Sequence, residues 1–223
     1  MGTITAQTII NRAATLLEDT GNTSFTRSEL LDWLNEAQTQ VVAFVPGASS
    51  KAASLQLSVG TKQTLPSEAI VLIEAVRNTG GAAVRLAPRE SLDGGPVDWH
   101  TVTAKDAVKN YVYDVNVPDI FYVYPPNTGN GYLDVVYAVT PTVLASESSA
   151  ISVKDVYAAA LLNYVLFRVH SHDTDYLSGG KEAAAAYYQL FKDCLSGRAN
   201  MDISVGANNA LAPLNPANQG STK

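Results

Sequence analysis

The sequence is poor in charged residues. Of its 223 residues, 15 are Lys or Arg and 21 are Asp or Glu, which together make 16% of the chain, whereas an average soluble protein has about 25%. Neutral residues (Ala, Ser, Thr, Asn and Gly) stand in their place. Because a solvent-facing monomer usually carries more Lys and Glu, the deficit indicates a surface covered by neighbouring subunits. A merely neutral polar surface fits the composition equally well.

Other missing features exclude further classes of protein. There is no run of Lys or Arg, and the formal net charge is −6, which argues against binding to nucleic acid or anionic lipid through bulk positive charge. The one cysteine, Cys194, excludes an internal disulfide framework and a four-cysteine zinc site. No stretch approaches the roughly 20 apolar residues that span a bilayer, and no export signal opens the chain, so we expect production in the cytoplasm and no membrane.

Helical periodicity appears twice in the first 45 residues. Apolar residues recur at spacings of three and four within residues 4–19, and the polar turn TGNTS follows. The second pattern opens with the sequence of a capping box, in which Thr26 caps the helix and Glu29 reaches back to it. Two helices joined by so short a turn predict an antiparallel hairpin.

From about residue 54 the period changes to two, which is typical of β-strands. The strongest strand patterns are KNYVYD, DIFYVYPP and YLDVVYAV, which are rich in aromatic and β-branched residues. Residues 114–118 and 127–131 contain turn residues, the latter the glycine-rich turn GNG, and predict hairpin loops. The pattern predicts a meander or small sandwich of six or seven strands, with a helical turn at PRESLD.

The helical period returns near residue 152. Ser152 is the predicted cap of a third helix, with Asp155 at the third position after it. The polar stretch HSHDTD ends that helix, and a fourth follows, with Gly179-Gly180 a weak point near its start. Its predicted apolar stripe is Leu177, Ala183, Ala184, Tyr187, Tyr188, Phe191 and Leu195.

The chain after Arg198 contains only two charged residues, Asp202 and Lys223, and is rich in Asn, Ala, Pro and Gly, a composition that predicts an extended arm. The arm is expected to dock on a neighbouring subunit or a different protein. Its predicted docking residues are Met201, Ile203, Val205, Leu211, Pro213, Leu214 and Pro216.

These patterns together predict an α+β fold in four stretches. Residues 1–50 form an N-terminal helical hairpin, residues 51–145 an inserted antiparallel β domain, and residues 146–197 a C-terminal helical hairpin that completes a four-helix bundle. Residues 198–223 form the extended arm.

The search for catalytic chemistry finds one suggestive cluster, His170, His172, Asp173 and Asp175. Imidazoles and carboxylates close together are the ligands of divalent metals, and a hydrolase that uses the two histidines is one reading of the cluster. The spacing departs from the HxHxDH metallo-hydrolase motif, however, and a helix C-terminus followed by an aspartate cap explains the residues better. We therefore predict no metal, no cofactor and no enzyme.

Two smaller features have structural explanations. Cys194 has no histidine at helical spacing and is interpreted as a small buried residue of the fourth helix. Asp98-Trp99-His100 could supply an acid-base pair, but adjacent residues of an extended chain point to opposite faces, so a role in fixing a loop is favoured.

Four tyrosines of the strand region, Tyr111, Tyr113, Tyr122 and Tyr124, could stack on bases or sugars. Alternation places Tyr111 with Tyr113 on one face of a strand, and Tyr122 with Tyr124 likewise. Base-stacking strands also carry Arg and Lys, and these carry only Lys109. A sheet core or subunit interface is favoured, and a carbohydrate- or fibre-binding tail component remains the alternative.

Several segments, in order, resemble a family of adaptor proteins of short-tailed phages over about residues 3–197. They are TAQTIINRAATLLED, FTRSELLDWLNEAQTQVVAFVPGA, DWH, YVYDVNVPDIFYVYPP, LDVVYAVTPT and ISVKDVYAAALLNYVLFRVHSHDTDYLSGGKEAAAAYYQLF. The resemblance implies a structural virion protein of the tail or neck, assembled in the host cytoplasm. It implies a ring, commonly of twelve copies, that binds beneath the portal and carries the tail nozzle and fibres.

The resemblance also implies partners for each part of the chain. The helices pack subunit against subunit, the β insertion and the arm reach neighbours, and such arms often dock on the portal. DNA would pass through the ring's channel without specific binding, since an acidic lining repels phosphate.

Overall fold

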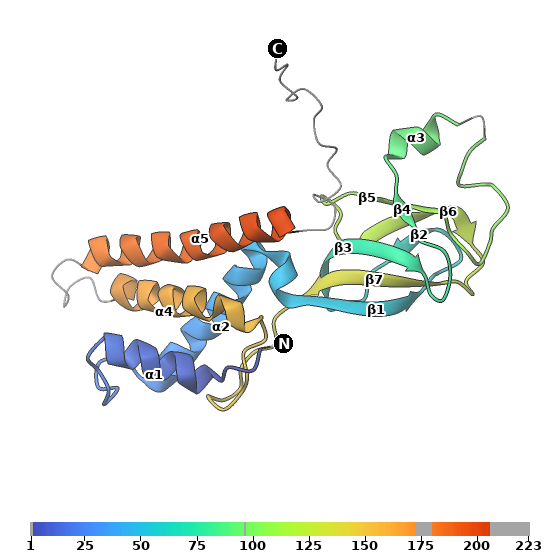
Figure 1. The fold of residues 1–223 in the computed structure, drawn as a ribbon. Coiled ribbons are helices and arrows are strands. Elements are labelled where there is room, and N and C mark those ends of the chain that lie inside the picture. The colour runs from blue at the N-terminus through green and yellow to red at the C-terminus, as the bar shows by residue number, and fades with distance from the viewer. Residues whose placement is uncertain (1, 96, 173–179, 206–223) are drawn as a thin grey trace, which may run out of the picture.

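The computed structural model describes residues 2–95, 97–172 and 180–205 and shows a mixed α+β fold. A helical part, built from both ends of the described chain, and a β part, built from its middle, lie at opposite ends of an elongated molecule (Figure 1). The helices are α1 (Ala6–Leu16), α2 (Arg27–Phe44), α3 (Arg89–Asp93), α4 (Ala158–His172) and α5 (Gly180–Val205), with 3-10 turns η1 (Pro46–Ser49) and η2 (Asp155–Tyr157).

The β part contains two sheets, of strand order β1-β7-β3 and β2-β6-β5-β4. All pairs are antiparallel except β4–β5, which is parallel, so the prediction of a wholly antiparallel domain is wrong for that pair. The strands are β1 (Ser50–Gln56), β2 (Gly60–Thr64), β3 (Ala69–Asn78), β4 (Arg85–Leu86), β5 (Asn110–Tyr113), β6 (Ile120–Asn127) and β7 (Tyr132–Val139).

Both sheets contribute to one apolar core. Phe121 of β6 in one sheet and Leu133 and Tyr137 of β7 in the other are almost completely buried in it. Alternation along β6 explains this placement, since Phe121 and Val123 point inward while their neighbours face outward. The β part therefore has a core separate from the helical part.

Asn127 organises the turn between β6 and β7. Its fully buried side chain donates hydrogen bonds to the carbonyl oxygens of Lys105 and Asp106, and it accepts hydrogen bonds from the amides of Gly129 and Gly131. Gly129 has a φ of 96°, a conformation that favours glycine. The glycine-rich hairpin turn predicted from the sequence is confirmed here.

The capping box predicted at the start of α2 is confirmed. Thr26 accepts a hydrogen bond from the Glu29 amide, and the Glu29 carboxylate accepts one from the Thr26 amide, which completes the capping box. The apolar stripe of α1, including Ile9 and Ile10, is buried against the other helices. A local sequence signal therefore determines where α2 begins.

Helix α4 lies at the centre of the helical part and contacts α1, α2 and α5. The Tyr164 hydroxyl donates a 2.8 Å hydrogen bond to Glu36 of α2, and Arg168 lies 3.4 Å from the same carboxylate. The pKa of Tyr164 is raised, mainly because the hydroxyl is buried and to a smaller extent because it donates the hydrogen bond to Glu36. On the other side, the Tyr164 ring contacts the buried ring of Phe191 from α5 at 5.1 Å.

Residues 140–157, which we call the closing segment, return the chain from β7 to the helices. Asn35 of α2 accepts a hydrogen bond from the Leu144 amide and donates one to the Leu144 carbonyl. Gln38, which is almost completely buried, accepts a 2.6 Å hydrogen bond from the Ser152 amide. Two side chains of α2 thus fix the path of the returning chain.

The closing segment also binds the N-terminal residues. The Asp155 carboxylate accepts hydrogen bonds from the Thr3 hydroxyl and from the Thr3 and Ile4 amides, and these lower its pKa. The prediction that Ser152 caps a helix is wrong. Its hydroxyl donates a hydrogen bond to the Thr142 carbonyl, and α4 begins only at Ala158. Asp155 instead accepts hydrogen bonds from backbone amides of the N-terminal residues.

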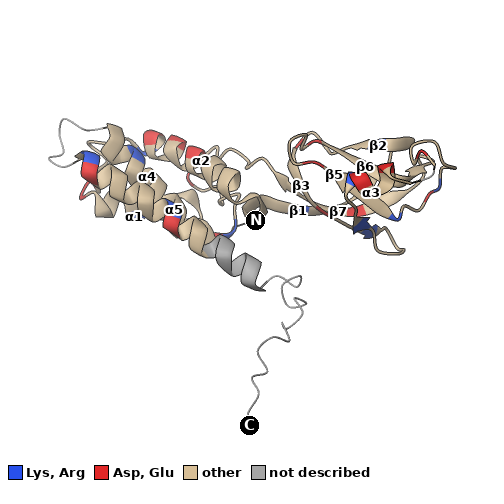
Figure 2. Cartoon of the chain, turned by 90° about the horizontal axis from the view of Figure 1, so that it is seen from above, with Lys and Arg blue, Asp and Glu red and all other residues tan. Residues whose placement is uncertain are grey.

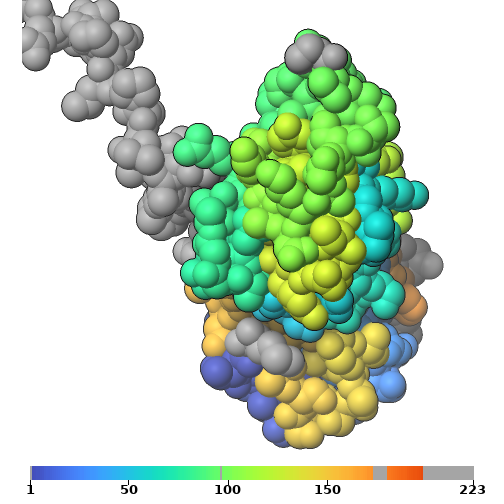
Figure 3. All heavy atoms as spheres, turned by 90° about the vertical axis from the view of Figure 1, so that its right-hand side faces the viewer, coloured from blue at the N-terminus to red at the C-terminus, as the bar shows by residue number. Residues whose placement is uncertain are grey.

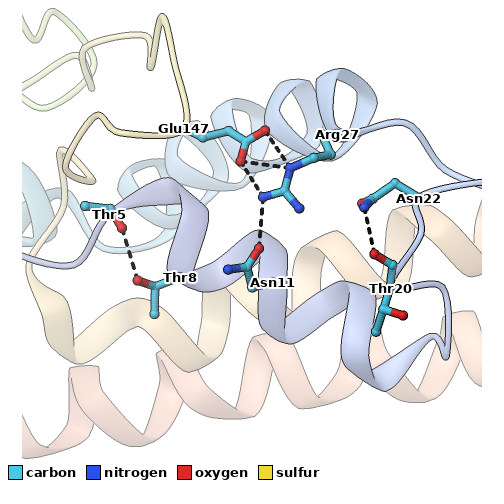
Figure 4. A network of polar contacts seen from close by, with 7 residues as sticks. All are labelled: Thr5, Thr8, Asn11, Thr20, Asn22, Arg27 and Glu147. Carbon is cyan, nitrogen blue, oxygen red and sulfur yellow. Dashed lines mark hydrogen bonds and ion pairs between the residues drawn. The ribbon is translucent and has the colours of Figure 1, made fainter.

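Arg27, at the start of α2, makes the charged contact of this junction. Its guanidinium donates hydrogen bonds to both carboxylate oxygens of Glu147 and to the Asn11 side chain of α1 (Figure 4). The hydrogen bonds from Arg27 lower the pKa of Glu147. One arginine therefore joins α1, α2 and the closing segment.

Two sequence predictions about helix α5 are wrong. It continues to Val205, so residues 198–205, which composition had placed in an extended arm, are helical. The physical reason is that the Pro- and Gly-containing stretch begins only at Gly206. Cys194 is exposed and not buried, because the buried face of α5 passes through its neighbours Phe191 and Leu195. Leu177 of the predicted stripe lies outside the described residues.

We predict that Glu147→Gln lowers the free energy of unfolding by about 1 kcal/mol at neutral pH, because the two-point contact with Arg27 loses its charge while remaining partly solvent-exposed. The Glu147 pKa is lowered by folding, so this contribution is complete above the unfolded pKa of about 4.3 and is lost as the pH falls through the lower folded value. Urea unfolding of both proteins between neutral and acidic pH should give curves that converge in acid.

Glu182→Gln is the matched control, because Glu182 is exposed in the first turn of α5. It should leave the free energy of unfolding nearly unchanged. A constant difference between wild type and Glu147→Gln at all pH values would contradict the role given to the Arg27 contact.

Candidate interaction surfaces

A groove of about 840 Å³ lies over the outer face of the four-stranded sheet. Val112 of β5 and Ile120 and Tyr122 of β6 line it from the sheet, and residues 86–90, which include the first two residues of α3, line another side. The segment that contains α3 stands above the strands when the β part is viewed from its outer end (Figure 3). The groove is therefore formed by a sheet face and the excursion between β4 and β5.

Trp99 is held firmly at one side of this groove. Its indole nitrogen donates a 2.7 Å hydrogen bond to the Asp93 carboxylate, and this bond is the main reason that the pKa of Asp93 is lowered. The Trp99 ring stacks on His100 with ring centroids 3.7 Å apart and meets Tyr122 edge-on at 6.3 Å. His100 in turn shares a 2.8 Å hydrogen bond with the Thr61 hydroxyl of β2.

These contacts bear out the loop-fixing role favoured for Asp98-Trp99-His100. The Asp98 carboxylate accepts a hydrogen bond from the backbone amide of His100 and makes none with the imidazole ring. The chain turns here, so the rings of Trp99 and His100 lie together and do not point to opposite faces.

The rim of the groove is apolar and open. Leu86 is 61% exposed, Val115 is 69% exposed and Val117 is 46% exposed, although all three are large aliphatic residues. Two charged side chains of opposite sign, Arg89 and Glu90, stand at the α3 side. A site with this lining can bind an uncharged, apolar ligand, whereas a strongly charged one would gain little there.

The four tyrosines named from the sequence do not share one surface. In the register of β5 and β6, Tyr111 pairs with Val123 and Tyr113 with Phe121, so these two tyrosines face the core. The Tyr113 hydroxyl donates to the Pro118 carbonyl and accepts from the amide of Leu72 in the other sheet.

Tyr122 and Tyr124 lie on the opposite, outer face of the same sheet and are half-buried. Tyr122 lines the groove, and Tyr113 is also among its lining residues, although Tyr124 is not. Any binding surface of the outer face is therefore built on Tyr122 and its neighbours Val112 and Trp99. The sequence missed this surface because the strand register that brings Val112 opposite Tyr122 is not visible in either strand alone.

The two histidines considered as metal ligands point away from each other. The His170 ring stacks on Tyr187 of α5, whereas the His172 ring lies against Trp33 of α2, as expected for residues two apart on a helix. Burial lowers the pKa of His170. Asp173 and Asp175 lie outside the described residues. Within the described ranges, no group of three or more His, Cys, Asp or Glu side chains could hold a metal ion.

The docking residues predicted for the arm fall into two sets. Met201, Ile203 and Val205 belong to the last turns of α5. Leu211, Pro213, Leu214 and Pro216 lie outside the described residues. The last described residue of α5 that is buried in the helical core is Leu195.

Charged groups are sparse on both parts of the molecule, and acidic residues form a row on α2 (Figure 2). The acidic residues of this helix are Glu29, Asp32 and Glu36. In the part of the chain that the structure describes, no helix is long and apolar enough to cross a membrane.

A comparison with models of protein families identifies the family of this chain. A family model described as SU10 adaptor protein matches residues 4–216, nearly the whole chain. The chain belongs to the SU10 adaptor protein family. The match confirms the resemblance to phage head-to-tail adaptors found in the sequence. No curated protein matches the sequence.

Membership of the SU10 adaptor family supports a structural role in a phage particle and argues against an enzyme. An adaptor family also implies contacts with portal and tail proteins and a place in the virion.

We predict that Trp99→Phe raises the pKa of Asp93 toward its ordinary value, because the variant keeps the aromatic ring but loses the indole N–H that binds the carboxylate. An NMR titration of the Asp93 carboxyl group measures the change. Trp33→Phe, in the helical part, is the control and should leave Asp93 unaffected. An unchanged pKa in Trp99→Phe would mean that the indole does not hold this loop.

Proposed function

We propose that this chain is a structural virion protein, a head-to-tail adaptor that forms a ring beneath the portal and connects it to the tail nozzle and fibres. The family match over residues 4–216 carries the proposal. Twelve copies are expected, with a central channel through which DNA passes during ejection without specific binding. The net charge of −6 supports a channel that does not hold phosphate.

In this proposal each part of the chain has its own task. Residues 1–50 and 146–197 form a four-helix bundle, and this bundle packs between neighbouring copies. Contacts of α4 with α1, α2 and α5 support a single helical unit. Residues 51–145 form a domain that projects from the bundle, and their separate core supports this division. A closed ring consumes two different faces of every subunit, which fits a surface with few charges.

The end of the chain, residues 198–223, is the proposed docking arm for the portal or a neighbouring subunit. Its helical portion extends α5 beyond Leu195, the last described residue buried in the helical core. Met201, Ile203 and Val205 would then serve a partner, together with Leu211, Pro213, Leu214 and Pro216.

The second candidate is a carbohydrate- or fibre-binding tail component. The observation that favours it is that Tyr122 lines an open groove beside the stacked rings of Trp99 and His100. Glycan binding by the isolated protein, lost on replacement of Tyr122 and Tyr124 by alanine, would support it.

The mass of the assembly tests the adaptor proposal. The purified chain has a mass of 23.7 kDa, and on mixing with its portal it should form a ring whose twelve copies add about 280 kDa to the portal. Native mass spectrometry or light scattering measures this directly. A chain that stays monomeric in the presence of portal would contradict the proposal.

Deletion of residues 199–223 provides a separate prediction. Every residue of the described apolar core precedes this point, so the melting temperature should stay close to that of the full chain. Attachment to the portal should weaken, because the proposed docking residues are removed. Melting curves and a portal pull-down check the two expectations. If the truncated chain binds the portal as well as the full chain does, the arm is not part of that interface.

A further inference from the structure

The groove over the outer face of β5 and β6 has the features of a peptide-binding site. Its floor and one side are aromatic and aliphatic: Tyr122 and Val112 line it from the sheet, and the side is formed by His100 stacked on Trp99, which is itself almost completely buried. Hydrogen bonds to Asp93 and Thr61 hold Trp99 and His100 in place. Pre-positioned aromatic rings bind proline-rich segments well, since the ligand loses little conformational freedom and the groove needs no rearrangement. The ligand that fits this groove is therefore an uncharged, proline-containing segment.

The chain itself contains such a partner sequence near its end. Residues 211–216 read Leu-Ala-Pro-Leu-Asn-Pro, in which Pro213 and Pro216 are three residues apart. Three residues make one turn of a polyproline II helix, so both prolines would lie on one edge about 9 Å apart. The residues before them, Ala212 and Asn215, are restricted to extended conformations by the following proline.

Charge also fits. Among residues 206–223 only Lys223 carries a charged side chain, and the groove presents one arginine and two acidic residues, Arg89, Glu90 and Asp114, at its edges. An uncharged, apolar segment therefore meets the aliphatic rim of Leu86, Val115 and Val117 without burying an unpaired charge.

We propose that the groove on β5 and β6 binds residues 211–216 of a second copy of this chain. Groove and segment are different surfaces of the same protein, so the segment of each copy can occupy the groove of the next and close a ring of heterologous contacts. This inference rests on the proposed ring. Helix α5 runs obliquely to the line that joins the two parts of the molecule (Figure 2).

A weak contact of this type suffices in a ring. Each peptide contact is repeated by symmetry, and the helical contacts proposed between neighbours hold the segment near the groove at a high effective concentration. The segment would then contribute to the order of assembly, since a groove is filled only when a neighbouring copy is present.

The first experiment measures the contact alone. A synthetic peptide of residues 206–223 is titrated into the full chain carrying Leu211→Ser, Pro213→Ser, Leu214→Ser and Pro216→Ser, whose own segment cannot compete. Saturable binding is expected, with shifts of the Trp99 indole resonance in NMR spectra. A peptide with Pro213→Ala and Pro216→Ala should bind at least about tenfold more weakly, and one with Asn208→Ala and Asn209→Ala should bind as well as the natural sequence.

Groove variants locate the contact. Leu86→Asp with Val115→Asp, added to the same protein, should abolish peptide binding while the fold is kept, because both residues are exposed. Val143→Asp is the matched control, since Val143 is equally exposed but lies in the closing segment, and it should bind the peptide normally. No binding, or binding that survives the groove substitutions, would overturn the proposal. So would a glycan that binds this groove while the peptide does not.

The second experiment tests whether the partner is another copy. One full chain carries the groove substitutions and keeps its segment, and the other carries the segment substitutions and keeps its groove. Each should stay monomeric alone, and their mixture, at concentrations above the Kd measured for the peptide, should give a one-to-one complex in analytical ultracentrifugation. Peptide binding without a mixed complex would show that the segment folds back on its own subunit, and the second-copy assignment would be wrong.

The outcomes separate this inference from the proposed function. If the wild-type chain forms a ring with portal but the peptide does not bind, the groove assignment fails and the adaptor role stands. If peptide and mixed complex behave as expected but no ring forms with portal, the adaptor proposal fails and the groove contact stands.

Discussion

The contact of the closing segment with α2 and the N-terminal residues determines how the two parts of this molecule are joined. Helices α1 and α2 precede β1 in the sequence, and α4 and α5 follow β7. The whole β part therefore separates the two pairs of helices along the chain. Asn35 and Gln38 bind backbone groups of the returning chain, and Asp155 binds backbone groups of the N-terminal residues. Because these bonds hold the segment that leads directly into α4, they fix where α4 enters between α1 and α2.

Part of the neutral polar content of this chain serves its interior. Four of the five buried polar residues in the described part of the chain are neutral amides. Asn127 fastens the β6–β7 turn, Gln63 binds the backbone of Ser58 and Gly60, and Gln38 binds the closing segment. An amide can satisfy buried backbone groups as donor and acceptor at once, without the cost of burying a charge. Neutral polar residues therefore stabilise the interior, and their abundance does not by itself show that the surface is covered.

Features encoded by neighbouring residues could be predicted from the sequence, and features that need distant partners could not. The Thr26–Glu29 capping box and the glycine-rich turn after β6 depend on residues a few positions apart, and both are present. Asp155 was misassigned because its partner, Thr3, is 152 positions away. The groove was missed for the same reason, since Tyr122 and Trp99 meet only after β5 and β6 pair and the excursion between β4 and β5 folds over them.

The separate core of the β part has a consequence for assembly. Phe121, Leu133 and Tyr137 are buried in a cluster made only of residues from the β part, so the core behind the four-stranded sheet does not depend on the helices. Its groove depends on the Trp99 loop, which is fastened to Asp93 and Thr61 within the same part. In the proposed ring, the helical contacts and the groove contacts would therefore form on two separate parts of the subunit. The energy of each adds to the other only when both neighbours are in place.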